Sequence, residues 1–396
     1  MVINIDPSLS EKTISLPADL FEICRLPEDL PYEIVVDDTS IAIGPIIAMV
    51  AYRDKKKMSC RALDKLKLRF SHYERIKGLI FVCAANCIIP NENTIEGYYF
   101  NPNGTSSKTR WKYGRYPYPN AVYKRVPIES TSYNHLISKV GNRVINSVFF
   151  LKADIVKEVE KDKKFSSFFP HTELLRNEKQ IRTLITQFQS VYIKPSNGSQ
   201  GEGVYKVTVD KHNRLNIIDR ENKKTVISNN GILTNYLKIW TKKEYIIQKA
   251  IKPIGNQNID FRVYVQKNGL GNWCCQGMIG RLAKQGTIIT NLKYAAEILE
   301  GRAAIKKFFP LDSPKAKSLE EEIYTRCIGV CKEIDMKFGT YGDVAVDVIV
   351  DSNLSVWILE INKVYGYNSI RKMKNQTLLE TLFTTPFDYA KTLAGF

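Results

Sequence analysis

The sequence predicts a mixed α/β protein with more than one domain. Its 396 residues suffice for two or three domains, and 44% hydrophobic with 25% charged residues is the composition of a soluble protein with a sizeable core. Short apolar runs of strand character alternate with segments of helical periodicity along the chain. The third observation is a hairpin pattern near the C-terminus whose apolar strands carry polar side chains.

This hairpin pattern consists of two apolar runs, Val344–Val350 and Val356–Ile361, on either side of a polar turn. Asp347, Glu360 and Asn362 interrupt the runs, and strand alternation brings all three onto one small patch. Two carboxylates and an amide oxygen on a dry wall repel one another unless a cation lies between them. Oxygen-only ligands suit Mg²⁺. The alternative is a hairpin whose acids face solvent.

The formal net charge of +17 indicates an anionic partner: nucleic acid, an anionic surface, or a polyanionic small substrate. The longest lysine run, Lys55–Lys57, is short, so no dedicated nucleic-acid arm is indicated. The eight cysteines show no spacing typical of zinc sites. The N-terminus lacks a signal-peptide pattern, and there is no run of 18 apolar residues. We therefore expect a cytoplasmic protein with reduced thiols and no membrane segment.

Residues 1–145 are expected to form one α/β domain. Ser40–Ala51 and Lys77–Cys87 are candidates for buried strands, and Gly97–Val126 has the composition of a loop followed by a short strand. Aromatic and basic residues alternate within Trp111–Tyr116. This pattern suggests either base stacking on single-stranded nucleic acid or, as the simpler interpretation, a packed aromatic loop.

The next region begins with two segments of helical periodicity, Lys152–Glu160 and Glu173–Phe188. Val191–Val209 then predicts two strands joined by a glycine-rich tip, with Lys194 on the leading strand. Glycines allow backbone N–H groups to approach an anion closely, so the tip is a candidate phosphate-binding element. It is neither a P-loop nor a dinucleotide fingerprint.

Further strands are predicted at Glu244–Ile251, Asp260–Gln266 and Cys274–Leu282. Arg262 and Arg281 lie within these apolar strands, and an arginine is hard to bury without an anionic partner. Their partner is either a phosphate or carboxylate ligand, or an acid of the protein itself. A helix over Ser318–Lys337 and a helical C-terminal tail complete the predicted elements.

Taken in order, these elements resemble the ATP-grasp enzymes over nearly all of residues 146–370. The order is an upstream lysine, a strand lysine with a glycine-rich hairpin, a glutamine-containing strand, D-x-R, R…TN and D…E-x-N. Within this superfamily the chain is similar to the endospore coat-associated (YheC/YheD-like) proteins. The segments that carry this similarity are IAIGPIIAMVA, FFPHT, YIIQKAI, IDFRVYVQKN and IITNL.

The resemblance implies an ATP-grasp fold, in which two α+β subdomains clamp a nucleotide, preceded by an N-terminal α/β domain. The implied domains are 1–145, resembling a pre-ATP-grasp domain, and 146–396, the ATP-grasp domain. Within the latter, the lid subdomain is expected at about 190–250 and the metal-binding subdomain at about 251–396.

The resemblance also implies roles for individual residues. The nucleotide would be held by two lysines, the glycine-rich lid and the strand beside the adenine: Lys152, Lys194, Gly198, Ser199, Gly201, Gly203, Gln248, Lys249 and Ile251. Mg²⁺, with Mn²⁺ as an alternative, would be held by Asp347, Glu360 and Asn362. Arg281 and Asn291 would lie at the γ-phosphate, and Arg262 would orient the acid substrate.

The implied reaction is ATP-dependent formation of an amide from a carboxylate and an amine, through an acyl-phosphate, on an amino acid, peptide or protein. Two alternatives remain open: an ATP-binding, spore-coat-associated protein with little turnover, and a basic nucleic-acid-binding protein, which the scattered lysines disfavour. Two departures from the family pattern lie where the acceptor would bind. Ala295 and Ala296 replace a glycine pair, and Tyr365–Gly366 replaces a proline–glycine turn.

Overall fold

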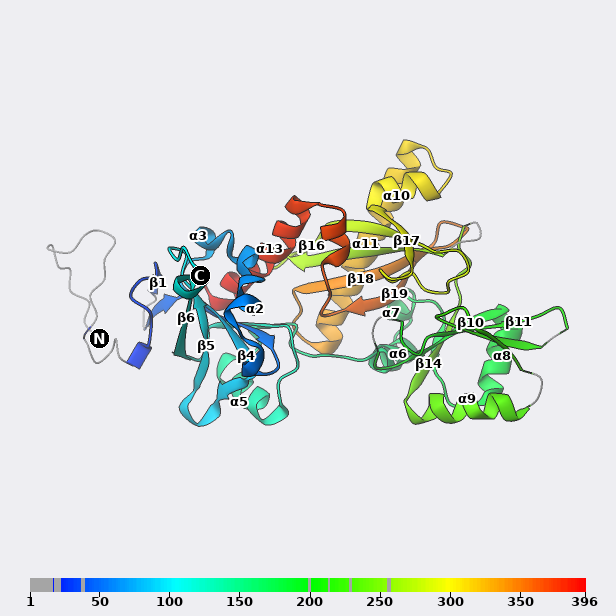
Figure 1. Ribbon diagram of the computed structural model, residues 1–396, viewed down its shortest axis with the longest axis horizontal. Coiled ribbons are helices and arrows are strands. Elements are labelled where there is room, and N and C mark those ends of the chain that lie inside the picture. The colour runs from blue at the N-terminus through cyan, green and yellow to red at the C-terminus, as the bar shows by residue number, and fades with distance from the viewer. Residues whose placement is uncertain are drawn as a thin grey trace. The chain divides into compact units, whose positions relative to one another are not determined.

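The computed structural model describes residues 17, 23–36, 40–198, 201–212, 214–227, 230–254 and 258–396 (Figure 1). The chain divides into two compact units. The first comprises Met1–Arg143 and Leu393–Phe396, and the second comprises Val144–Thr392. The candidate ligand residues all belong to the second unit.

The first unit is built on a sheet in the order β6-β5-β4-β3-β7, beside a two-stranded ribbon of β1 and β2. β3 runs parallel to β4 and β7, and the other pairs are antiparallel. The strands are β1 (Glu33–Val36), β2 (Ile41–Gly44), β3 (Ile46–Tyr52), β4 (Leu79–Ile89), β5 (Thr94–Phe100), β6 (Trp111–Pro117) and β7 (Ala121–Lys124). The helices are η1 (Lys55–Lys57), α2 (Cys60–Asp64), η2 (Lys67–Phe70), α3 (Tyr73–Ile76), η3 (Pro90–Glu92), α4 (Ser107–Arg110) and α5 (Ser130–Val140).

The prediction that Gly97–Val126 is mainly loop is wrong, because the aromatic segment forms β6, paired along its length with β5. Trp111 and Tyr116 are buried, and Trp111 packs edge-on against Phe70 and Phe100. The exposed positions between them carry charged and aromatic side chains. Only Trp111 and Tyr116, five residues apart, are buried in this strand, so its alternation is not visible in the sequence.

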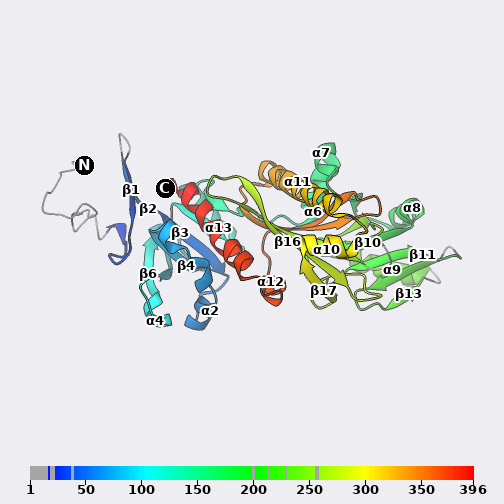
Figure 2. The same cartoon turned by 90° about the horizontal axis from the view of Figure 1, so that it is seen from above.

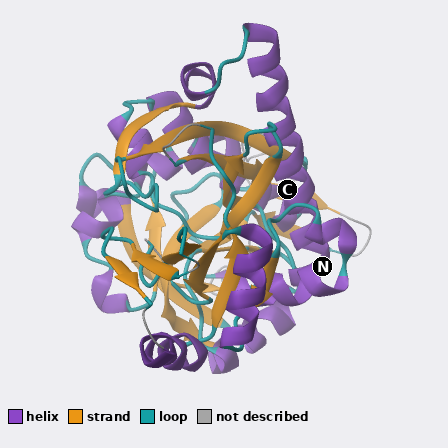
Figure 3. Ribbon diagram, turned by 90° about the vertical axis from the view of Figure 1, so that its right-hand side faces the viewer, coloured by secondary structure: helices purple, strands orange, loops and turns teal. Residues whose placement is uncertain are grey.

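The second unit contains a six-stranded antiparallel sheet in the order β13-β12-β11-β10-β14-β9. Its strands are β9 (Thr172–Leu174), β10 (Ser190–Pro195), β11 (Tyr205–Val209), β12 (Leu215–Asp219), β13 (Lys224–Val226) and β14 (Tyr245–Lys249). Helices α8 (Glu178–Phe188) and α9 (Asn230–Lys242) pack on one face of this sheet around Trp240, Ile185 and Ile193 (Figures 1 and 3). The opposite face carries Lys194 and Gln248, which are therefore free to border a cavity.

The predicted helix over Glu173–Phe188 begins later than expected. Thr172–Leu174 forms β9, which pairs with β14, and the helix starts only after Asn177, whose side chain accepts a hydrogen bond from Gln180 N. The apolar periodicity cannot separate a short edge strand from a helix that follows it within three residues.

The second sheet of this unit has five antiparallel strands in the order β17-β16-β15-β18-β19. These are β15 (Ile259–Lys267), β16 (Trp273–Ala283), β17 (Ala295–Glu300), β18 (Asp343–Val350) and β19 (Val356–Asn362). Helix α11 (Ser313–Phe338) lies across one face, next to α10 (Gly301–Phe308), and buries Ile323, Cys327 and Val330 (Figure 2). It starts five residues before the predicted Ser318, because Asp312 caps it and Pro314 occupies its first turn.

The remaining elements of the second unit precede or follow the strands of these two sheets in the chain. They are β8 (Val144–Ile145), α6 (Lys152–Lys161), α7 (Lys163–Ser166) and α12 (Asn368–Lys372). The C-terminal helix α13 covers Gln376–Ala394. All eight cysteines are free thiols. In the described ranges no helix is long and apolar enough to cross a membrane.

Candidate active site

The hairpin of β18 and β19 brings the three predicted oxygen ligands onto one face of the five-stranded sheet. Asp347 pairs with Glu360, and Ala345 pairs with Asn362. Directly paired residues and those two positions away share a face. Asn362 Nδ2 lies 3.4 Å from Asp347 Oδ2, and all three side chains line one cavity. Strand alternation therefore predicted their proximity correctly.

A β-bulge directly after Asp347 modifies this face. Asp347 pairs with Glu360 but Val348 pairs with Ile358, so Leu359 is the additional residue of β19. Adjacent side chains on a regular strand face opposite ways, whereas Leu359 and Glu360 both line the cavity. The bulge thus adds an apolar wall beside the carboxylate.

Two arginines and two aspartates form an alternating series of ion pairs on the same face. Arg262 donates from Nε and Nη2 to the two oxygens of Asp347, at 2.7 and 2.8 Å. Arg281 is bonded to Asp260 in the same bidentate manner, at 2.7 and 2.5 Å, and its Nη2 lies 3.3 Å from Asp347 Oδ1. Burial raises the pKa of Asp347, but the charges of Arg262 and Arg281 outweigh burial and hold it at about 2. Both arginines therefore have carboxylate partners within the protein.

Asp260 is a functional-site residue that sequence reasoning did not single out. It is only 6% exposed, and besides Arg281 it accepts a hydrogen bond of 2.5 Å from Thr290 Oγ1. The D-x-R spacing was the available signal, since residues two apart on a strand share a face. Through Thr290, Asp260 fixes the start of the segment that contains Asn291.

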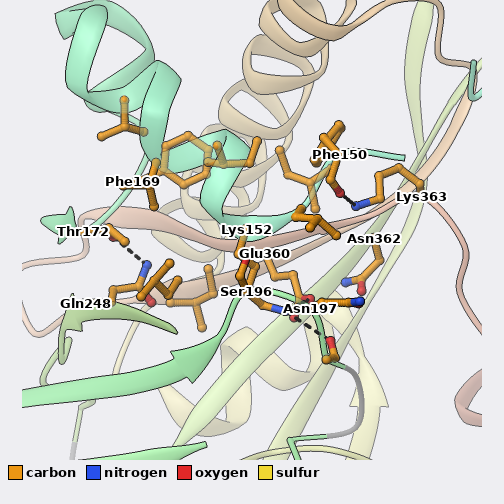
Figure 4. Close-up of a pocket in the computed structure, with 18 of the residues that line it drawn as sticks. Phe150, Lys152, Phe169, Thr172, Ser196, Asn197, Gln248, Glu360, Asn362 and Lys363 are labelled. Atoms are coloured by element: carbon orange, nitrogen blue, oxygen red, sulfur yellow. Dashed lines mark hydrogen bonds and ion pairs between the residues drawn. The ribbon is translucent and has the colours of Figure 1, made fainter. Parts of the chain in front are cut away.

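Lys152 is the first residue of α6 and lines both this cavity and the adjoining pocket that Figure 4 shows. Its ammonium lies 3.0 Å from Glu360 Oε1 and donates to Gly198 O at 3.2 Å. Ser196, directly after β10, holds the beginning of α6: its Oγ accepts from Ala153 N and its carbonyl accepts from Lys152 N. The position of Lys152 is therefore set by both the helix and the glycine-rich hairpin.

Lys194 lies on the cavity side of β10 and donates to Gln248 Oε1 at 2.7 Å. Gln248 is held in place because its Nε2 donates to Thr172 Oγ1 at 2.9 Å (Figure 4). Burial lowers the pKa of Lys194 to about 8, an effect only partly offset by the negative charge of Glu360. Within the described residues, Lys194 has an amide and no directly paired carboxylate. This is the expected environment of a cation whose partner is a ligand.

The glycine-rich hairpin between β10 and β11 needs glycine at two described positions. Gly201 and Gly203 have φ of +73° and +67°, and a Cβ at either would lie 2.6 Å from Ile289 Cδ1 or Tyr245 Oη, respectively. Gly198 and Gly201 line the cavity, as predicted for a segment that covers a phosphate chain. The predicted residue Ser199 lies outside the described residues.

Three further predicted residues also border this cavity, whereas Arg281 and Gly203 are not among its lining residues. Lys249 and Ile251 line it at the end of β14, and the Lys249 ammonium lies 5.2 Å from the ring centroid of Phe188. Asn291 lines it opposite the hairpin, 3.1 Å from where a Cβ of Gly201 would be. An apolar recess around Phe150 and Phe169 adjoins the cavity beneath α6 (Figure 4).

A groove next to the cavity shares Arg262, Asn291 and Asn362 with it. Arg281, Lys372 and both departures from the family pattern are found at or near this groove. Ala295 begins β17, and the preceding residue, Tyr294, lines the groove. Tyr365 lines the groove and donates to the buried Asp343 at 2.5 Å. The residues at the two departures are not among the lysines and oxygen ligands that line the cavity.

The donor chemistry of the site fits a divalent cation of the Mg²⁺ type. No group of three or more His, Cys, Asp or Glu residues that could hold a metal occurs in the part of the chain that the structure describes. Asp347, Glu360 and Asn362 provide two carboxylates and one amide oxygen, a set suited to Mg²⁺ shared with phosphate oxygens.

A sequence profile described as YheC/D-like ATP-grasp matches residues 141–393. The chain belongs to this family. The ATP-grasp fold assigned by resemblance is thereby confirmed.

Two relatives of this YheC/D-like protein come from Bacillus subtilis (strain 168). Endospore coat-associated protein YheD is 27% identical over 410 residues, covering 97% of this chain and 86% of that protein. Endospore coat-associated protein YheC is 21% identical over 241 residues, covering 59% of this chain and 65% of that protein.

Solved structures with a similar arrangement include VanG D-Ala:D-Ser ligase from Enterococcus faecalis, with a TM-score of 0.49 and 12% identity over 88% of this chain and 98% of that chain. The ATP-grasp ligase PsnB, complexed with a variant of its minimal precursor, Mg and ADP, also has a TM-score of 0.49, with 11% identity over 89% and 99% of the two chains. At these values neither likeness bears on the substrate of this YheC/D-like protein.

Proposed function

We propose that this protein is an ATP- and Mg²⁺-dependent carboxylate–amine ligase that acts on an amino acid, peptide or protein through an acyl-phosphate. The observation that carries the proposal is the convergence of Lys152 and Lys194 with Asp347, Glu360 and Asn362 on one cavity. Membership of an ATP-grasp family supports the nucleotide assignment.

In this proposal the nucleotide lies between the two sheets of the second unit. Lys152 and Lys194 neutralise phosphate oxygens, and the hairpin of Gly198, Gly201 and Gly203 covers them with backbone N–H groups. Gln248, Lys249 and Ile251 line the adenine end. When bound to Asp347, Glu360 and Asn362, Mg²⁺ would supply positive charge to the phosphates.

The chemical step transfers the γ-phosphoryl group and then replaces it. A substrate carboxylate oriented by Arg262 attacks the γ-phosphorus, the bond to the ADP oxygen breaks, and an acyl-phosphate forms. An amine then attacks the acyl carbon, phosphate leaves, and the nitrogen loses a proton to give the amide. Arg281 and Asn291, which border the groove, stabilise the negative charge in this sequence.

The test is release of ADP and phosphate from ATP and Mg²⁺ with pooled amino acids and peptides, scored by mass for new amides. Glu360→Gln is the matched variant, because it removes one carboxylate that is not part of the arginine–aspartate pairs. We expect it to lose roughly 100-fold or more of acceptor-dependent turnover, the scale of one transition-state electrostatic contact. Arg182→Gln, on the exposed face of α8, serves as the control with unchanged turnover.

The alternative, an ATP-binding coat-associated protein with little turnover, is favoured by the names of the two curated relatives and by the two departures from the family pattern at or near the groove. ATP binding that depends on Lys194, without phosphate release for any acid–amine pair, would favour it over the ligase. Absence of ATP binding would contradict both.

A further inference from the structure

Asp347 already uses both of its oxygens. They accept from Arg262 at 2.7 and 2.8 Å, and Arg281 Nη2 and Asn362 Nδ2 lie at 3.3 and 3.4 Å. Asp347 is 6% exposed, so water does not compensate for a lost partner. A divalent cation that binds Asp347 therefore competes with Arg262 for these oxygens.

Arg262 lies where its displacement has a defined consequence. It lines both the cavity and the adjoining groove, with a side chain that is 18% exposed. A guanidinium and a divalent cation on the same two oxygens repel each other, and a largely buried guanidinium that loses its carboxylate needs another anion.

The protein itself offers no suitable replacement among the described residues of the groove. Glu202 is the acid that lines it, but its side chain is 75% exposed and lies 3.7 Å from Arg220. Asp260 is occupied by Arg281 and Thr290. The new anion must come from a ligand.

We propose that Arg262 exchanges partners: without metal it is bound to Asp347, and with a divalent cation at Asp347 it becomes the receptor for an anionic group, a carboxylate or a phosphoryl group, in the groove. This proposal rests on the metal site of the proposed function. It makes Arg262 a positioning residue that couples metal binding to anion binding, and the coupling acts equally in both directions.

The experiment measures Mn²⁺ affinity by the loss of the free-ion electron paramagnetic resonance signal, in the absence of nucleotide. The probes are N-acetylglycine for a carboxylate and methylphosphonate for a phosphoryl group, at constant ionic strength and corrected for complexes formed without protein. For the unmodified protein we expect the accepted probe to tighten Mn²⁺ binding about tenfold, and Mn²⁺ to tighten binding of that probe by the same factor.

Arg262→Gln should bind Mn²⁺ alone more tightly than the unmodified protein, and the coupling should disappear. Arg262→Lys, which keeps the charge, should restore part of the coupling, whereas a purely structural role would give no such rescue. Arg182→Gln should behave like the unmodified protein, and circular dichroism would verify that each variant is folded. Weaker Mn²⁺ binding in folded Arg262→Gln, or coupling that persists in it, would overturn the proposal.

The probe that tightens Mn²⁺ binding identifies the anion that Arg262 accepts. If neither probe changes Mn²⁺ affinity, the proposal is also overturned. The ligase assay on the unmodified protein is read separately. Ligase turnover without coupling between Mn²⁺ and the probes would contradict the partner exchange of Arg262 and leave the proposed function in place. Coupling between Mn²⁺ and a probe, without ATP binding or ligase turnover, would instead contradict the proposed function.

Discussion

The two walls of the cavity differ in how their charges are neutralised. On the five-stranded sheet, Arg262 and Arg281 each have a carboxylate partner within 3 Å. On the six-stranded sheet, the nearest partner of Lys194 is the amide of Gln248, and burial lowers the pKa of this lysine to about 8. The first wall is electrically balanced without a ligand, whereas the second gains a full charge partner only when an anion binds.

This difference separates arginines whose charge is already paired within the protein from a lysine that gains its charge partner only with a ligand. Removing one member of a buried ion pair leaves an uncompensated charge, so the loss appears in stability. Removing a partly buried lysine that has no carboxylate partner relieves a desolvation cost, so the loss appears in ligand affinity. Substitutions on the two walls should therefore fail in different assays.

The largest effect is expected from Arg281→Ala. Arg281 is 2% exposed and bonded to Asp260, so its removal leaves a buried carboxylate with only Thr290 as a close partner. We expect the free energy of unfolding to fall by about 3–5 kcal/mol, measured by urea denaturation. Arg182→Ala, in an exposed pair with Glu178, is the control and should change it by less than about 1 kcal/mol. An unchanged midpoint of urea denaturation for Arg281→Ala would show that the ion pairs on the five-stranded sheet do not stabilise the fold.

The next effect is on nucleotide affinity. Lys194→Ala removes a charge-assisted phosphate contact of roughly 1.5–3 kcal/mol, so ATP affinity should fall about ten- to hundredfold by calorimetry. Unfolding stability should stay the same or rise slightly. Lys211→Ala, at an exposed turn, is the control. Unchanged ATP affinity in Lys194→Ala would remove this residue from the nucleotide site.

A smaller effect follows from the pKa of Lys194. With a value of about 8 in the free protein, the ammonium is charged at pH 7 and mostly neutral at pH 9. A bound phosphate stabilises the ammonium and raises its pKa, so binding above pH 8 must take up a proton. ATP affinity should therefore fall about tenfold between pH 7 and pH 9. Lys194→Arg should flatten this dependence, since arginine stays charged. If Lys194→Arg leaves the pH dependence of ATP affinity unchanged, the proton taken up on binding belongs to another group.

The elements that were predictable from the sequence are those governed by strand alternation and glycine chemistry. Asp347, Glu360 and Asn362 share a face because residues two apart on a strand do so, and Gly201 and Gly203 adopt positive φ. The bulge at Leu359 was not predictable, because it is a shift in the pairing of β19 with β18, which the WILEIN segment alone does not reveal. Nor could the sequence distinguish a ligand-binding arginine from a paired one, because the pairing of Asp260 with Arg281 depends on the register between β15 and β16.

The smallest effect is expected from the lysines of the first unit. Lys55–Lys57 form η1, with no buried residue, and Lys55 is paired with Glu96 at 2.6 Å in an exposed setting. The neighbouring cations of β6 are likewise matched, Lys112 by Asp29 and Arg115 by Glu92. Exposed pairs of this kind contribute little to stability, because water and salt screen their charges. Replacing all three lysines by glutamine should therefore leave ATP affinity and phosphate release unchanged, measured beside Lys194→Ala.

A nucleic-acid-binding function would give a different result. Affinity for single-stranded DNA or RNA would then fall with salt by roughly 0.7–0.9 decades per decade of salt for each phosphate contact, and the triple replacement would reduce that slope. Tight binding with such a slope, together with no ATP consumption, would overturn the assignment of the positive charge to the nucleotide and its acid substrate.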